Sequence, residues 1–375
     1  MNTAKKLSEQ LLQSAGITIN GTQPWDIQIH NEDVYERVLR EGTLGLGESY
    51  MEGWWDCQQL DAFFFRVIRA DLESELNRNR TAILKLILKN VWAKMVNLQT
   101  KKRTHTLSEK HYDLGNKLFQ SMLDVRMNYT CGYWKNAQNL SEAQLAKVDL
   151  VCQKLMLQPG MSLLDIGCGF GAFAKYAAEK YGVKVTGITL SREQYQFAIK
   201  NCEGLPIEIR LQDYRDVHEK FDRIASIGMF EAVGHLNFRT YMQMIHRCLS
   251  DDGLFVLHTM GANKTSVRGD GWLAKHIFPD GMSPSIKQIG KSSEGLLVME
   301  DWHNFGADYD KTLMAWHKNF NEHWNELKQD YDQCFFRMWN YYLLSCAGGF
   351  RAREMQLWQI VFSKKGLIGG YQAPR

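Results

Sequence analysis

The pattern of apolar and polar residues changes along the chain near residue 140. From there on, short apolar runs typical of buried strands alternate with amphipathic segments of helical spacing. Strands are expected at residues 162–166, 183–188, 207–211, 223–227, 254–258 and 358–362. Helices are expected at residues 172–180, 194–201 and 241–249. This alternation predicts an α/β fold, a Rossmann-like parallel sheet with helices on both faces.

The N-terminal part follows a different pattern. Residues 4–15 have helical spacing, residues 25–30 alternate like a strand, and residues 63–68 begin a strongly apolar segment of helical type. Turns are expected at Gly42, Gly45, Gly47 and Gly53. We therefore expect a smaller, mainly helical domain at residues 1–104 and a catalytic domain at residues 105–375.

A basic amphipathic segment closes the N-terminal part. Residues 78–103 contain eight Lys or Arg residues and no Asp or Glu, and apolar residues recur at helical spacing from Ile83 to Val96. Such a helix can lie on an anionic membrane surface. It can equally pack on the domain core with its lysines in solvent, as most amphipathic helices do. The absence of acidic residues keeps the membrane interpretation open.

Composition narrows the class of protein. The 375 residues are 45% hydrophobic and 23% charged, which is typical of a globular protein. No apolar run reaches the roughly 18 residues of a spanning helix, and the first 13 residues lack the apolar core of a signal peptide. We therefore expect an intracellular protein. The eight cysteines are scattered without a C-x-x-C pair, so no zinc site is expected.

A glycine-rich turn follows the first predicted strand. Residues 165–171 read D-I-G-C-G-F-G, and a helix follows. Glycines at such a turn let the backbone approach a ligand closely. A dinucleotide site would have its third glycine one residue later and an acid after the second strand, whereas here that strand runs into Thr189-Leu190-Ser191. The segment resembles the first motif of Rossmann-like S-adenosylmethionine (SAM) methyltransferases.

Two further segments are suited to complete a SAM site. Because no acid ends the second strand, Gln194 is the candidate for the ribose hydroxyls. After the third strand, Asp213 can accept a hydrogen bond from the adenine amine and Tyr214 can cover the ring, although an ordinary loop is the alternative. The predicted cofactor-binding residues are Tyr129, Thr130, Asp165, Gly167, Cys168, Gly169, Gly171, Thr189, Leu190, Gln194, Gln212, Asp213 and Tyr214.

Motifs outside the cofactor segment carry a family resemblance through most of the chain. They are residues 47–55 (GESYMEGWW), 111–116 (HYDLGN), 128–134 (NYTCGYW), 228–231 (GMFE), 257–259 (LHT), 299–306 (MEDWHNFG) and 346–353 (CAGGFRAR). Together they closely resemble cyclopropane-fatty-acyl-phospholipid synthases. The catalytic part is similar to mycolic acid cyclopropane synthases, which lack the N-terminal domain.

The resemblance implies a methylene addition. The cis double bond of an unsaturated phospholipid acyl chain attacks the methyl group of SAM, and a bound bicarbonate removes a proton from the resulting carbocation, so that the ring closes. The residues that correspond to the family's bicarbonate pocket are Cys131, Glu231, His258 and Tyr309, with a backbone contact at Met260. A cysteine assigned to the family's active site corresponds to Cys346. These five side chains are the predicted catalytic residues.

The strand pattern itself supports two of these residues. Glu231 follows the fourth strand and His258 ends the fifth, so both reach the edge at which ligands bind in open parallel sheets. The alternatives are a capping role for Glu231, a satisfied core histidine at His258, packing at Cys131 and plain pocket lining at Cys346. The family commonly has a histidine after the acid; here it is Ala232, and His235 is the candidate substitute.

The resemblance also implies where the enzyme works. We expect a cytoplasmic homodimer bound peripherally to the inner face of the membrane, with unsaturated phospholipid as its substrate and no nucleic acid as a partner. One alternative keeps the fold and cofactor but ends in a methyl-branched or hydroxylated chain. The others are a membrane-binding protein with a degenerate methyltransferase fold and an RNA methyltransferase.

Overall fold

The computed structural model describes residues 3–70, 115–279 and 281–375, which form two compact units. The first unit combines Met1–Val96 with Val267–Pro279 and Tyr309–Met355. The second combines Asn97–Ser266 with Asp280–Asp308 and Gln356–Arg375. The units thus interleave along the chain. The expected boundary at residues 104 and 105 and the basic segment 78–103 lie outside the described residues.

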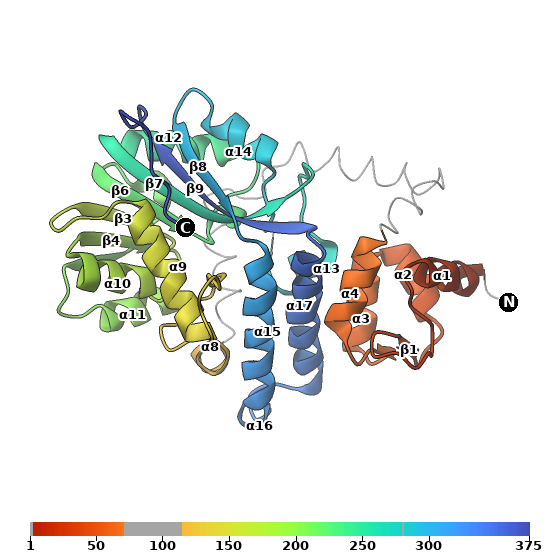
Figure 1. Ribbon diagram of the computed structural model, residues 1–375. Helices are drawn as coiled ribbons and strands as arrows, with labels where there is room; N and C mark the ends of the chain where they lie inside the picture. The colour runs from red at the N-terminus through yellow and green to blue at the C-terminus, as the bar shows by residue number, and fades with distance from the viewer. Residues whose placement is uncertain (1–2, 71–114, 280) are drawn as a thin grey trace. The chain divides into compact units, whose positions relative to one another are not determined.

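A seven-stranded sheet forms the centre of the second unit (Figure 1). Its strands are β3 (Ser162–Ile166), β4 (Lys184–Thr189), β5 (Ile207–Leu211), β6 (Phe221–Ile227), β7 (Leu249–Ala262), β8 (Val298–Asn304) and β9 (Met355–Ser363). Their order in the sheet is β5-β4-β3-β6-β7-β9-β8. Strands β3 to β7 pair in parallel, and β8 pairs with β9 antiparallel. The predicted α/β sheet is confirmed.

Helices bury both faces of this sheet. They are α8 (Asn116–Met122), α9 (Leu140–Lys154), α10 (Ala172–Tyr181), α11 (Arg192–Asn201), α12 (Phe238–Cys248) and α14 (Ile286–Ser293), with short 3-10 turns η1 (Tyr214–Asp216) and η2 (Phe230–Ala232). Leu163 packs into one core cluster with residues of α9 and α10, and its neighbour Leu164 packs into the other with residues of α12 and α14. Successive strand residues point to opposite faces, so the continuous apolar runs are explained.

The first unit is mainly helical among its described residues. Its helices are α1 (Thr3–Ser14), α2 (Val34–Glu41), α3 (Thr43–Met51), α4 (Leu60–Arg69), α13 (Gly271–His276), α15 (Ala307–Glu322), α16 (Trp324–Leu327) and α17 (Gln333–Arg351). The strand expected at residues 25–30 contracts to β1 (Gln28–Ile29), which pairs with β2 (Trp55–Asp56).

Two of the expected turns in this unit are wrong. Gly45 and Gly47 lie inside α3, whereas Gly42 and Gly53, with φ of 63° and 76°, do interrupt the helices. A Cβ atom on Gly47 would lie 2.3 Å from the Trp272 ring, and one on Gly45 would lie 2.7 Å from a backbone oxygen of α2. The glycines therefore permit close packing of α3, which offsets their intrinsic cost in a helix of about 1 kcal/mol.

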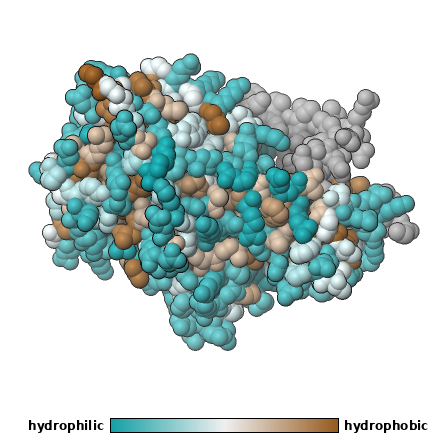
Figure 2. All heavy atoms as spheres, in the orientation of Figure 1, coloured by the Kyte–Doolittle hydropathy of each residue, from teal (hydrophilic) through white to brown (hydrophobic). Residues whose placement is uncertain are grey.

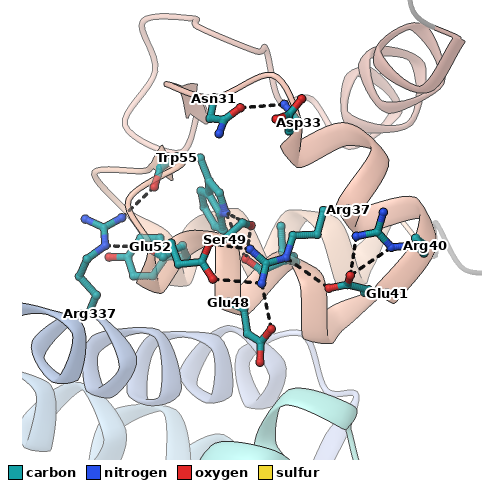
Figure 3. A network of polar contacts seen from close by, with 12 residues as sticks. Asn31, Asp33, Arg37, Arg40, Glu41, Glu48, Ser49, Glu52, Trp55 and Arg337 are labelled. Atoms are coloured by element: carbon teal, nitrogen blue, oxygen red, sulfur yellow. Dashed lines mark hydrogen bonds and ion pairs between the residues drawn. The ribbon is translucent and has the colours of Figure 1, made fainter.

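Ion pairs connect the helices of the first unit (Figure 3). The Arg37 guanidinium of α2 donates to Glu48 at 2.9 Å and to Glu52 at 2.7 Å. From α17, Arg337 donates to the backbone oxygens of Tyr50 and Trp55, the latter at 2.8 Å. These contacts tie α2 and α17 to the same stretch around α3.

In the part of the chain that the structure describes, no helix is long and apolar enough to cross a membrane. In the view of Figure 2, hydrophilic residues cover most of the face, and hydrophobic residues form small separate spots.

Candidate active site

The glycine-rich turn connects the carboxyl end of β3 to α10. Gly167, Gly169 and Gly171 have φ of 79°, 54° and 84°, a backbone conformation that side chains disfavour. A Cβ on Gly167 or Gly171 would lie within 2.9 Å of a neighbouring side chain, but one on Gly169 would meet nothing within 4 Å. The turn therefore leaves open space beside Gly169, as a backbone cradle for a ligand requires.

Asp165, at the end of β3, has an unsatisfied oxygen. The residue is 1% exposed, and its Oδ2 has no hydrogen-bond partner among the described residues. Burial raises the pKa of the Asp165 carboxyl to about 7, while the charge of Lys147 opposes that rise. A buried acceptor without a partner needs an explanation, and the ammonium group of a SAM methionine is a chemically suitable donor.

Gln194 lies on the helix that follows β4, as predicted. It is buried in the first turn of α11, and its Oε1 accepts a hydrogen bond of 3.0 Å from the Thr189 hydroxyl. An amide oxygen has a second lone pair, and the amide nitrogen carries two donors. The side chain is therefore equipped for ribose hydroxyls, and its role in binding them stays a prediction.

The residues after β5 are more strongly engaged than the sequence suggested. The Asp213 carboxylate accepts from Nε and Nη2 of Arg215 at 2.8 and 2.7 Å and also caps η1 through the Arg215 N–H. Tyr214 is buried and packs on Tyr241 with ring centroids 5.1 Å apart. The Gln212 side chain donates to the backbone oxygen of Asp216. An adenine site beside these residues remains untested.

Glu231 lies on η2, directly beyond the carboxyl end of β6. Its Oε1 accepts a hydrogen bond of 2.7 Å from the backbone N–H of Met260. Its Oε2 is buried without a partner in the described parts of the chain. Burial raises the pKa of this carboxyl above its ordinary value, against the Met260 hydrogen bond, which lowers it. Met260 thus orients Glu231, and a direct contact of Met260 with bicarbonate stays a prediction.

His258 lies in β7 opposite Ile227, the last residue of β6, and is 1% exposed. Its Nδ1 lies 3.2 Å from the amide nitrogen of Gln359. If the amide nitrogen donates to Nδ1, the neutral ring carries its proton on Nε2. Burial lowers the pKa of His258 well below its ordinary value. The Nε2 donor has no partner among the residues described, so the ring offers one directed N–H.

The segment that contains Cys131 reaches the same sheet edge. A Cβ on Gly228, which follows β6, would lie 2.6 Å from Cγ2 of Thr130, and Gly228 N–H donates to the His258 carbonyl oxygen. Cys131 is fully buried, with Sγ 3.1 Å from the Gly132 oxygen. The structure thus brings the 128–131 segment, Glu231 and His258 to one edge of one sheet.

Comparison with known proteins identifies the family. A family model described as "Mycolic acid cyclopropane synthetase" matches residues 99–360. The cyclopropane-fatty-acyl-phospholipid synthase of Escherichia coli (strain K12) is 52% identical over 370 residues, covering 99% of this chain and 96% of that one.

The chain belongs to the cyclopropane synthase family.

Solved structures agree with this assignment. The cyclopropane synthase MmaA2 from Mycobacterium tuberculosis superposes with a TM-score of 0.66 at 31% identity, covering 69% of this chain and 98% of that one. The mycolic acid cyclopropane synthase CmaA1, solved with SAH and CTAB, superposes with a TM-score of 0.65 at 31% identity, with the same coverage. The predicted family and the methyltransferase fold are confirmed.

Two buried polar residues beside the 128–131 segment, Gln144 and Lys147, were not predicted from the sequence. Lys147 Nζ donates to Thr130 Oγ1 at 2.8 Å and to Asn128 Oδ1 at 3.3 Å, and Gln144 Nε2 donates to the Thr130 carbonyl oxygen at 2.7 Å. Both residues are buried on α9. Their burial could have been predicted from the helical spacing, because both residues occupy core-facing positions between the apolar residues Leu140 and Val148.

The remaining predicted catalytic residues, Tyr309 and Cys346, belong to the first unit. Tyr309 on α15 packs on Phe350, with ring centroids 4.6 Å apart. Burial and the nearby Asp270 charge raise the pKa of the Cys346 thiol to about 12, so the thiol is protonated and a poor nucleophile at neutral pH. The grouping of these two residues with Glu231 and His258 stays a prediction.

Proposed function

We propose that the chain adds a methylene group to the cis double bond of an unsaturated phospholipid acyl chain and so forms a cyclopropane fatty acid. The observation that supports this most is a pair of buried atoms, Glu231 Oε2 and His258 Nε2, for which the described residues provide no hydrogen-bond partner. Ring closure requires a base for a proton of the added methyl group. An acceptor and a donor at one sheet edge are suited to hold a small ion that acts as this base.

Two small molecules complete the proposed site. When bound, SAM supplies the methyl group and bicarbonate supplies the base. The turn at Gly167, Gly169 and Gly171 would let the cofactor approach the backbone, Asp165 would accept from its ammonium group, and Gln194 would bind its ribose.

The neutral state of His258 matters for the bicarbonate assignment. The ring would present Nε2–H as a donor to an ion oxygen, and Glu231 Oε2 would accept the O–H of the ion. Cys131 is assigned to this pocket by its place in the 128–131 segment. Tyr309 and Cys346 are included through the family resemblance alone.

Aromatic side chains of the second unit would keep water from the cation. The Phe305 ring lies 5.9 Å from the His258 ring and 5.3 Å from the Tyr133 ring, measured between centroids. A site enclosed in this way protects a carbocation from quenching by water. The alternative outcome, a hydroxylated chain, would require water at that point.

The location of the enzyme is part of the proposal. We infer a homodimer that binds the cytoplasmic membrane face through residues 78–103, whose eight basic and no acidic residues favour anionic lipid. The double variant Lys85→Glu, Lys89→Glu is expected to weaken binding to anionic vesicles in a flotation assay while SAM affinity stays unchanged. Unchanged flotation would reject this role for the segment.

The proposed reaction has a direct test. The protein is incubated with SAM and vesicles of an unsaturated phospholipid, and the released fatty acids are analysed by mass spectrometry and NMR. The expected product has gained one CH2, lost its double bond and contains a cyclopropane ring. The same mass with a methyl-branched alkene, or a hydroxylated chain, would reject ring closure, and no product despite SAM binding would reject the enzyme activity on these lipids.

A further inference from the structure

Lys147 is a buried lysine without an assigned role in the proposed reaction. It lies on α9, its side chain is 1% exposed, and both of its hydrogen-bond acceptors, Thr130 Oγ1 and Asn128 Oδ1, lie in the segment that leads into Cys131. A fully buried ammonium is costly unless nearby groups compensate its charge. The burial of a charged lysine at this position therefore needs a physical explanation.

The hydrogen bonds of Lys147 are incomplete. An ammonium group has three donors, and the residues that the structure describes supply acceptors for two of them. Buried donors normally find a partner. A ligand anion at this edge of the sheet would provide one.

The charge of Lys147 reaches the predicted bicarbonate residues. It contributes to the lowered pKa of His258, and it interacts electrostatically with Cys131 and Asp165. Of the nearby acids, Asp124 is already engaged by the backbone N–H and side-chain amide of Asn128. Asp165 has a free oxygen, which the proposed function assigns to the ammonium group of the cofactor.

Neither of the two residues proposed to contact bicarbonate carries a positive charge. Neutral His258 offers one N–H, and Glu231 is an acid, so an anion placed beside them meets repulsion that a single hydrogen bond does not balance. Two buried lysines of the described residues, Lys147 and Lys154, contribute to the lowered pKa of His258, and Lys147 is hydrogen-bonded to the 128–131 segment through Thr130.

We propose that Lys147 is the fixed positive charge of the anion site, and that it holds the 128–131 segment in place while its charge stabilises bound bicarbonate. This inference rests on the proposed function, because it takes bicarbonate as the ligand. Lys147 is then a positioning and anion-stabilising residue, while Glu231 and His258 contact the ion.

Calorimetry tests this proposal by binding rather than turnover. The protein is saturated with S-adenosylhomocysteine in a CO2-free buffer, and sodium bicarbonate is titrated into the wild type, Lys147→Met and Lys147→Arg. We expect bicarbonate to bind about tenfold more weakly to K147M. K147R keeps the charge and should bind within about threefold of the wild type. S-adenosylhomocysteine affinity reports on folding and should change little in both variants.

Lys154 provides a matched control on the same helix. It is also fully buried, but it lies 3.1 Å from His303 Nδ1 and 3.7 Å from Asp301, so its charge has a carboxylate partner outside the pocket. Lys154→Met should change bicarbonate affinity by less than about threefold. Equal losses in K147M and K154M would overturn a specific role for Lys147.

A second measurement does not depend on K147M folding. Burial lowers the pKa of Lys147 to about 8, against the charges of Asp124, Cys131 and Asp165, so its charge is present below that pH and is lost above it. From pH 7 to pH 9, bicarbonate binding to the wild type should therefore weaken several-fold more than binding to K147R, which stays charged. Parallel profiles would reject the proposal, because the titration of Asp165 and of the other facing groups is common to both proteins.

The outcomes separate the two claims. A wild type that does not bind bicarbonate overturns the base in the proposed function and this inference with it. Wild-type binding that K147M leaves unchanged overturns only the role of Lys147. Loss of S-adenosylhomocysteine binding in K147M without a change in its bicarbonate affinity would reduce Lys147 to a structural residue.

Discussion

Two polar regions of the molecule differ in how completely their groups are paired. In the first unit, Arg37 donates to three glutamates (Figure 3). One of them, Glu48, also pairs with Lys275 and His276. At the carboxyl edge of the sheet in the second unit, Glu231 Oε2 and His258 Nε2 are buried without partners among the described residues. The paired charges hold helices together, whereas the two unpaired atoms at the sheet edge are available to a ligand. Substitutions in the two regions should therefore change different properties.

The largest expected effect is loss of activity on replacing Glu231. Glu231→Gln keeps the shape but removes the carboxylate that would accept the bicarbonate O–H, so kcat for ring formation should fall about 100-fold or more. S-adenosylhomocysteine affinity and the melting temperature should stay close to those of the wild type, because no protein group loses a partner at Oε2. Steady-state kinetics and calorimetry measure these values.

Glu48→Gln is the matched control in the other region. The same change there removes a charge that three basic groups share, so stability falls while kcat per folded molecule is retained. If E231Q and E48Q lost equal activity, the absence of a hydrogen-bond partner would not distinguish a ligand-binding residue from a residue of a structural network.

The next largest effect is expected on the free energy of unfolding, when the ion pairs of Arg37 are removed. Arg37 is 14% exposed and Glu48 15%, so breaking their pair leaves poorly solvated charges. Arg37→Met should lower the free energy of unfolding by about 2 kcal/mol. A double-mutant cycle of Arg37→Met and Glu48→Gln, followed by urea denaturation, should give a coupling energy well above zero. Additive losses would show that the pair contributes nothing.

A smaller effect is expected at Gly169. Gly169→Ala forces a side chain into positive φ, at a cost of about 1 kcal/mol of stability, and it fills the open space beside the turn, so SAM affinity should fall about tenfold. Gly160 is the matched control, since it also has positive φ and open space but lies before β3. Gly160→Ala should lose the same stability and no SAM affinity. A similar affinity for both variants would contradict a cradle at Gly169.

The smallest effect on the free energy of unfolding is expected when an exposed ion pair is removed. Lys318 and Glu322 lie one turn apart on α15, 3.8 Å apart, with exposures of 73% and 57%. Lys318→Gln should change the free energy of unfolding by less than about 0.5 kcal/mol. A loss as large as that of Arg37→Met would show that burial does not determine the strength of these pairs.

The sheet was predictable from two kinds of strand pattern. β3 is a largely buried, mainly apolar run, and β5 alternates apolar and charged residues, and the expected ranges 162–166 and 207–211 match their observed bounds. β8 escaped prediction as a strand, since Val298–Asn304 mixes charged and aromatic residues on half-exposed positions and pairs only with β9 at the edge of the sheet. The interleaving of the two units was also not predicted, because it depends on contacts between segments far apart in the chain.

The candidate site was predictable where residue type and strand end coincide. Glu231 follows β6 as expected. His258 was expected to end its strand but lies inside the longer β7, opposite the last residue of β6, so both residues still reach one edge of the sheet. The sequence could not show that Met260 orients Glu231 or that Gln359 sets the histidine tautomer, since those contacts join distant segments. Lys147 was overlooked because a lysine in an amphipathic helix is ordinarily placed in solvent.

A crystal structure of the protein with S-adenosylhomocysteine and bicarbonate tests the central claim most directly. The account predicts one planar ion within about 3 Å of both Glu231 Oε2 and His258 Nε2. A structure in which these two atoms are paired with groups of the protein itself, with no ion between them, would contradict it.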